Sequence, residues 1–136
     1  MSVESVIVAR LLATSGVTDL IASRIRPFEL RQADGLGGIA YTTISEVPVG
    51  RMTGDNNTFR TRMQLDCFAA SYNDAKQIQA AVVAALDGYA AGDTDPEITS
   101  VRLETASDLP TEHTPGADKR RSYGVSLDFI IWHGSD

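Results

Sequence analysis

Between Phe59 and Tyr89 the hydrophobic pattern changes from a period of two residues to a helical period. Over residues 59–69, apolar positions alternate with polar ones, which is typical of a strand with one buried face. The outward positions include Arg60 and Arg62. We expect a turn at residues 71–73, after which apolar side chains recur at helical spacing as far as Tyr89. The segment therefore predicts a half-buried strand followed by an amphipathic helix.

A second helical pattern lies at the N-terminus. Val3, Ile7 and Leu11 share one helix face, Ser2 is placed to cap the start of this helix, and Gly16 is placed to end it. We expect one more helical turn after Thr18. The N-terminal segment has an acidic residue at Glu4 and no cationic leader, so it favours a helix over a signal peptide. This indicates synthesis in a cytoplasm.

Three further strands are predicted at residues 39–47, 97–105 and 123–132. In the second of these, the alternation places Ile98 on the face opposite Val101. The last strand is apolar on both faces near its end, so we expect it to be central in its sheet or to be covered by a partner. The predicted fold class is α+β, with an antiparallel or mixed β-sheet of about four strands, two main helices packed against it, and the order α-β-β-α-β-β. Residues 1–136 are expected to form a single domain.

Three loops separate these elements. Residues 32–38 are rich in glycine, and residues 48–58 and 107–119 contain proline, glycine and small polar residues. Long loops in compact domains are often functional, so we expect residues 50–58 and 107–119 to contact partners. Simple exposure explains both loops equally well.

Charge and composition exclude several classes of protein. The 136 residues include 12 basic and 18 acidic side chains, a net charge of −6 that argues against a protein that grips nucleic acid by neutralising phosphates. A channel through which DNA slides would tolerate this balance. The apolar share of 43% is ordinary for a globular chain, and no apolar run approaches the roughly 20 residues of a membrane span.

Residues with chemical potential are sparse. His113 and His133 are far apart in the chain, and Cys67 falls in the buried row of its strand, where a thiol is inert. The acidic residues 87–97 lack the glycine and distal glutamate of a calcium loop, and residues 35–38 lack the lysine of a phosphate loop. We therefore predict no enzyme activity, no catalytic residues, no metal site and no cofactor.

Six short segments follow one another along the chain: Arg24-Ile25-Arg26-Pro27, residues 40–45, residues 62–69, residues 73–75, residues 85–89 and residues 126–129. In their order and spacing, these segments resemble the tail-completion or tail-terminator proteins of long-tailed bacteriophages, prophages and gene-transfer particles. The similarity extends over most of the chain, although Gly38-Ile39-Ala40 stands where similar proteins often carry another proline.

The resemblance implies a structural subunit of the virion tail, assembled in the host cytoplasm. Such subunits form a ring, commonly a hexamer, at the head-proximal end of the tail tube, where the ring stops tube polymerisation and offers a docking surface to the filled head. The implied partners are further copies of the chain, the tail-tube protein and head-tail connector proteins, with DNA passing through the ring without sequence-specific binding and no membrane involved. The family shares architecture more than a site, so no functional residue is transferred.

Candidate interface residues come from this sequence alone. Ten of the 12 basic residues are arginine, a residue enriched at protein interfaces. Charge reversal at Arg60 or Arg62 is expected to spare folding and to weaken assembly. The full candidate set is Arg51, Asp55, Arg60, Arg62, His113, Arg120, Arg121 and Trp132.

Two other functions compete with the ring subunit. A head-tail connector or minor tail protein would also be small, acidic and oligomeric. A small ligand-binding or hydrolytic domain, with a pocket under the loop at Gly35–Gly38, would need a convergent polar cluster that the sequence does not show. The mass of the purified protein over a concentration series separates an assembly subunit from a monomeric ligand-binding domain.

Overall fold

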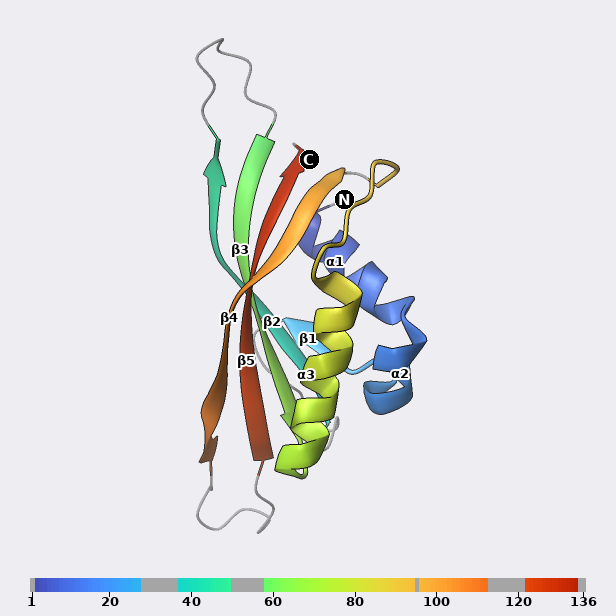
Figure 1. Cartoon of the computed structure of the whole chain (residues 1–136), viewed down its shortest axis with the longest axis vertical. Helices are drawn as coiled ribbons and strands as arrows, with labels where there is room; N and C mark the ends of the chain where they lie inside the picture. The colour runs from blue at the N-terminus through green and yellow to red at the C-terminus, as the bar shows by residue number, and fades with distance from the viewer. Residues whose placement is uncertain (1, 28–36, 50–57, 95, 113–121, 135–136) are drawn as a thin grey trace.

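Three helices cover one face of a twisted five-stranded sheet in the part of the chain that the structure describes (Figure 1). This computed structural model describes residues 2–27, 37–49, 58–94, 96–112 and 122–134. The strand order is β1-β2-β3-β5-β4, with β1 parallel to β2 and every other pair antiparallel. The elements are α1 (Val3–Leu12), α2 (Ser15–Ile21), β1 (Ile25–Pro27), β2 (Gly38–Pro48), β3 (Thr58–Ala69), α3 (Tyr72–Leu86), β4 (Ile98–Glu112) and β5 (Ser122–Gly134).

The α+β class and the mixed sheet are confirmed, but the predicted order and the number of elements are wrong. The order is α-α-β-β-β-α-β-β, because α2 and β1 are additional elements. Gly16 does not end the first helix: α1 stops at Leu12, Ala13 caps it, and Gly16 lies inside α2. β1 has three residues, which is too short for an alternation to be visible in the sequence.

β4 also differs from its prediction. It continues to Glu112, so residues 107–112 of the predicted loop are paired with β5. Ile98 is buried on the same side as Val101, because an irregularity between Ile98 and Ser100 shifts the alternation by one residue.

Serine side chains begin the two long helices. Ser2 Oγ accepts a hydrogen bond from the backbone N–H of Ser5, and Ser71 Oγ accepts one from the N–H of Asp74. α3 therefore starts inside the predicted turn. Its buried face matches the predicted stripe and consists of Ala75, Ile78, Val82, Ala85 and Leu86.

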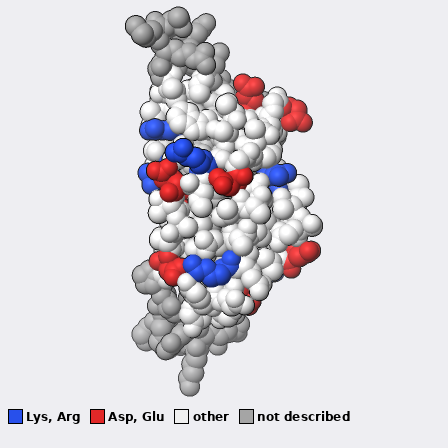
Figure 2. Space-filling model, viewed as in Figure 1, with Lys and Arg blue, Asp and Glu red and all other residues white. Residues whose placement is uncertain are grey.

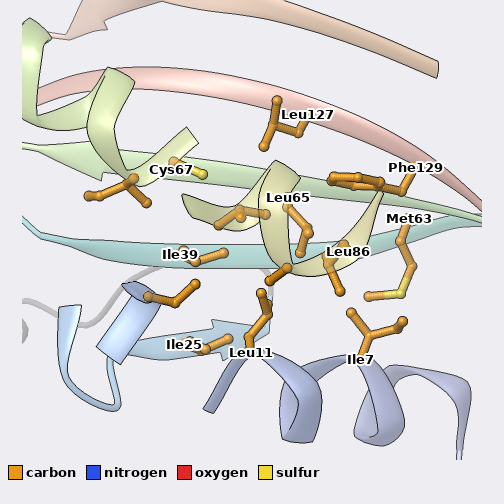
Figure 3. Packing of buried hydrophobic residues seen from close by; sticks show 14 of the residues in the cluster. Ile7, Leu11, Ile25, Ile39, Met63, Leu65, Cys67, Leu86, Leu127 and Phe129 are labelled. Atoms are coloured by element: carbon orange, nitrogen blue, oxygen red, sulfur yellow. The ribbon is translucent and has the colours of Figure 1, made fainter. Parts of the chain in front are cut away.

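The core lies between the helices and the inward faces of the central strands (Figure 3). Met63, Leu65 and Cys67 are fully buried, as the alternation in β3 predicts. Leu127 and Phe129 extend this layer from β5, because β5 pairs with β3 along its whole length. β5 lies between β3 and β4, so of the two predicted alternatives the structure shows the first, a strand inside the sheet. No described helix is both long enough and apolar enough to cross a membrane.

Candidate interface on the open face of the sheet

The sheet face opposite the helices is left uncovered by the described helices (Figure 1). We call it the open face and define it by two adjacent rows of residues that cross β2, β3, β5 and β4. The strand register gives the first row as Val47, Arg60, Trp132 and Ser100, and the second row as Ser45, Arg62, Ile130 and Arg102.

Three arginines dominate this surface, and they differ in their partners. Arg62 Nη2 lies 3.1 Å from Asp128 Oδ2, and Arg102 Nη2 lies 3.7 Å from Glu104 Oε2. The guanidinium carbon of Arg60 lies 5.8 Å from the centroid of the Trp132 ring, and no described carboxylate forms an ion pair with it. Among the described residues, Arg60 therefore has a stacking partner but no carboxylate partner.

The three arginines surround a shallow hollow of about 240 Å³. Ile130 and the half-buried Trp132 supply its apolar part. A planar cation stacked on an aromatic ring beside an aliphatic side chain is a combination enriched in the buried centres of protein interfaces.

The structure brings three of the eight predicted interface residues together. Arg60, Arg62 and Trp132 lie on neighbouring strands of the open face, with Arg60 and Arg62 on the outer side that the alternation predicts. Arg102 and Ile130 were missed, because only the cross-strand register shows that they join this cluster. The other predicted residues, Arg51, Asp55, His113, Arg120 and Arg121, lie outside the described residues.

A second hollow lies on the helix side, between α2 and α3, and has a volume of about 390 Å³. We call it the acidic cleft, because Asp19 and Asp74 are the ionisable residues that line it. Its position beside Gly37 is close to that expected for a ligand pocket, but two carboxylates and apolar side chains do not make a convergent polar cluster. Its lining residues are Asp19, Leu20, Gly37, Ala69, Ala70, Asp74 and Ile78.

His133 has a structural role inside β5. It is 1% exposed, and Thr61 Oγ1 lies 2.6 Å from its Nε2 atom. Nδ1 lies 2.7 Å from the carbonyl oxygen of Gly134, which can only accept, so Nδ1 carries the proton and Nε2 accepts from the Thr61 hydroxyl.

Cys67 is equally structural. Burial, with a smaller contribution from the charge of Asp66, raises the pKa of its thiol to about 12. A thiol held protonated in this way is a poor nucleophile and a poor metal ligand. No group of three or more histidine, cysteine or acidic residues suited to a metal ion occurs among the described residues.

A sheet covered by helices on one face, with arginines and a half-buried tryptophan on the other, suits a structural subunit of an assembly. The chain belongs to the tail completion protein gp17 family, whose model matches residues 5–134. Membership in this family confirms the prediction of a phage tail completion protein, a structural component of the virion tail with no enzymatic role.

Comparison with solved structures agrees in fold. A chain in a structure described as the virion of a native gene transfer agent (GTA) particle superposes with a TM-score of 0.76 at 14% sequence identity. The match covers 98% of this chain and 96% of that chain. At this identity the similarity shows a shared fold. No curated protein sequence matches the chain.

Proposed function

We propose that this chain forms a closed ring, a hexamer by analogy with its family, at the head-proximal end of a tail tube. The ring ends tube polymerisation and provides the surface to which the filled head docks. Membership in the tail completion family supports the location, and the open face carries the proposal of a ring, because it is an unpartnered surface suited to a neighbouring subunit.

The composition of the open face supports a protein contact. Val47 is 42% exposed beside Arg60, and Ile44, near the same edge of the sheet, is 51% exposed. Exposed aliphatic residues next to arginine and tryptophan suit an interface, where their burial excludes water from the charged contacts. We propose that Arg60, Arg62 and Trp132 contact the neighbouring subunit.

Residues of the two long loops complete the proposed interfaces. From the sequence, Arg51, Asp55, His113, Arg120 and Arg121 are proposed to contact the tail-tube protein or head-tail connector proteins. The net charge of −6 on each subunit agrees with passage of DNA through the ring without binding, since an acidic chain has few cations to neutralise phosphates. No cofactor enters this proposal.

Tube polymerisation in the presence and absence of the purified chain tests this function. We expect added chain to shorten the tubes formed by the tail-tube protein, and electron micrographs to show a ring on one tube end. The length distribution of negatively stained tubes is the measurement. Tubes of unchanged length contradict the terminator role, and binding to filled heads without binding to tubes would identify a connector instead.

A further inference from the structure

The open face and the acidic cleft lie on opposite sides of the same chain; three arginines and one glutamate line the hollow of the first, and two aspartates line the second. One lies on the outer surface of the sheet, and the other is formed by α2, α3 and the end of β3 on the helix side. Figure 2 shows acidic side chains on the helix-bearing edge of the molecule, on the right of the view. Two complementary surfaces on opposite sides of one subunit suit a head-to-tail contact between copies.

Arg60 is the cation that the open face has available for a partner. Arg62 and Arg102 each lie near a carboxylate of the same chain, whereas Arg60 is exposed and stacks only on Trp132 among its described contacts. A guanidinium over an aromatic ring can still donate its N–H groups to a carboxylate.

Asp19 is the matching anion of the acidic cleft. It lies in the last turn of α2, where the partial negative charge of the helix terminus disfavours a carboxylate. It is exposed, and none of the ion pairs between described residues involves it. Asp74, by contrast, lies in the first turn of α3, where the helix terminus favours its charge. Asp19 therefore has no ion-pair partner among the described residues.

An exposed aliphatic side chain accompanies the charge on each side. Val47 pairs across the strands with Arg60, and Leu20, which is 38% exposed, lines the acidic cleft beside Asp19. Contact between these two side chains would bury apolar surface around the ion pair and exclude water from it. The two surfaces thus match in both respects, with opposite charges and an exposed aliphatic side chain on each.

We propose that the open face of one subunit docks onto the acidic cleft of the next copy, with Arg60 donating to Asp19 and Val47 packing against Leu20. The contact rests on the proposed ring and specifies its interface. Since each subunit presents one surface of each kind, the contact is heterologous, and a closed ring satisfies all of them.

A charge exchange tests this contact. We expect Arg60→Glu and Asp19→Arg each to weaken self-association by about tenfold or more, because each places like charges together at the interface. The double variant restores the opposite charges and should return the dissociation constant to within about threefold of the wild type. Sedimentation velocity over a concentration series, with and without the tail-tube protein, gives these constants.

The matched control combines Arg60→Glu with Asp93→Arg, since Asp93 is also exposed but lies outside the acidic cleft. This control makes the same change in total charge and should not restore association. Circular dichroism and the unfolding midpoint confirm that each variant folds. The neutral pair Arg60→Gln and Asp19→Asn replaces any variant that does not fold, and each neutral change should weaken association less than a reversal does.

The outcomes separate this contact from the ring itself. A ring that forms normally with Arg60→Glu, or a double variant no better than its parents, overturns the contact and leaves the proposed function standing. Equal rescue by Asp93→Arg also overturns it, because net charge alone would then explain the result. A wild-type chain that stays monomeric even with the tail-tube protein contradicts both the contact and the ring.

Discussion

At the scale of single residues, the buried pair of Thr61 and His133 is the polar feature on which stability depends most directly. Both residues are at most 1% exposed, and the imidazole Nε2 accepts a hydrogen bond of 2.6 Å from the Thr61 hydroxyl. Phe59 stacks on the same imidazole, with ring centroids 5.9 Å apart. The histidine is thus enclosed by β3 and has no access to water that could replace a lost donor.

We expect Thr61→Val to lower the free energy of unfolding by about 1–3 kcal/mol, because the isosteric change leaves Nε2 buried without a donor. Urea unfolding of the purified chain measures this change. Thr105→Val is the control, since Thr105 is exposed and the same substitution there should change stability by less than about 0.5 kcal/mol. Equal effects at the two positions would show that the hydrogen bond to His133 contributes nothing.

Residue-scale burial was predictable where the alternation is regular and not elsewhere. The inward row of β3, from Met63 to Cys67, is read directly from a period of two. Ile98 was assigned to the wrong face, because a strand irregularity is a property of the paired strands and leaves no mark in a single sequence. The hydrogen bond between Thr61 and His133 was not predictable for a related reason, because the two residues are 72 positions apart in the chain.

At the scale of elements, a hydrogen bond joins α1 to the sheet. Thr43 Oγ1 of β2 donates to Glu4 Oε1 across 2.6 Å. Burial raises the pKa of the Glu4 carboxyl, but hydrogen bonds from Thr43, from the backbone and from Ser2 outweigh burial, so that the pKa lies below its ordinary value of 4.5. The ionised form is therefore stabilised more in the folded chain than in the unfolded chain.

This lowered pKa gives a dependence of stability on pH. The contribution of Glu4 is fully present above pH 4.5, the value expected in the unfolded chain, and is lost as the pH falls through the lower folded-state pKa. As the pH falls through this range, we expect the free energy of unfolding of the wild type to decrease by up to about 1 kcal/mol relative to that of Glu4→Gln. The effect is small because the carboxyl group is partly solvated. Urea unfolding at neutral and acidic pH measures it, with Glu97→Gln as an exposed control. A constant difference between wild type and Glu4→Gln would contradict the assignment.

The connection between α2 and β1 contains a strained residue. Ala22 caps the C-terminus of α2 with φ 53° and ψ −121°, a conformation that glycine adopts more readily than alanine. We expect Ala22→Gly to raise the free energy of unfolding by about 1 kcal/mol. Ala13→Gly is the matched control, because Ala13 caps α1 with φ −83°. This substitution should lower the free energy of unfolding by roughly 0.5–1 kcal/mol. Urea unfolding midpoints show whether each substitution raises or lowers stability. A loss of stability for both variants would refute strain at Ala22.

Elements were predictable in proportion to their length and regularity. β3 and α3 each extend over more than ten residues with one uninterrupted period, so both were predicted with nearly correct bounds. β1 forms because Ile25 aligns with Ile39 in a parallel pair, a contact between segments that the local pattern does not connect. The extension of β4 to Glu112 was hidden by Pro110, which usually marks a loop but is tolerated in an edge strand.

At the scale of the whole molecule, the family was predictable because the order and spacing of short segments extend along the chain, whereas the acidic cleft was not. Arg60 and Arg62 could be assigned to an outer face from alternation alone. The cleft requires α2, the start of α3 and the end of β3 to meet, and α2 itself was not fully predicted. Of the two surfaces in the proposed subunit contact, the sequence therefore predicts part of the open face but not the acidic cleft.

The proposed contact makes assembly sensitive to salt. Each subunit carries a net charge of −6, so salt screens repulsion between neighbouring subunits as well as attraction between Arg60 and Asp19. The Debye length is about 10 Å at 0.1 M salt, so repulsion over longer distances is largely screened at that concentration. Raising the salt to about 1 M shortens the Debye length to about 3 Å and therefore weakens mainly the close contacts. We expect wild-type self-association to weaken severalfold over this range while the unfolding midpoint stays nearly constant.

The Arg60→Glu variant should respond in the opposite direction, because salt screens the repulsion that the substitution creates between two carboxylates. Sedimentation velocity at the two salt concentrations measures both responses on chains that differ at one residue. The double variant with Asp19→Arg should behave like wild type, since it restores one attractive pair. Wild-type association that is unchanged or strengthened by salt would mean that apolar residues such as Val47, and not the ion pair, hold the subunits together.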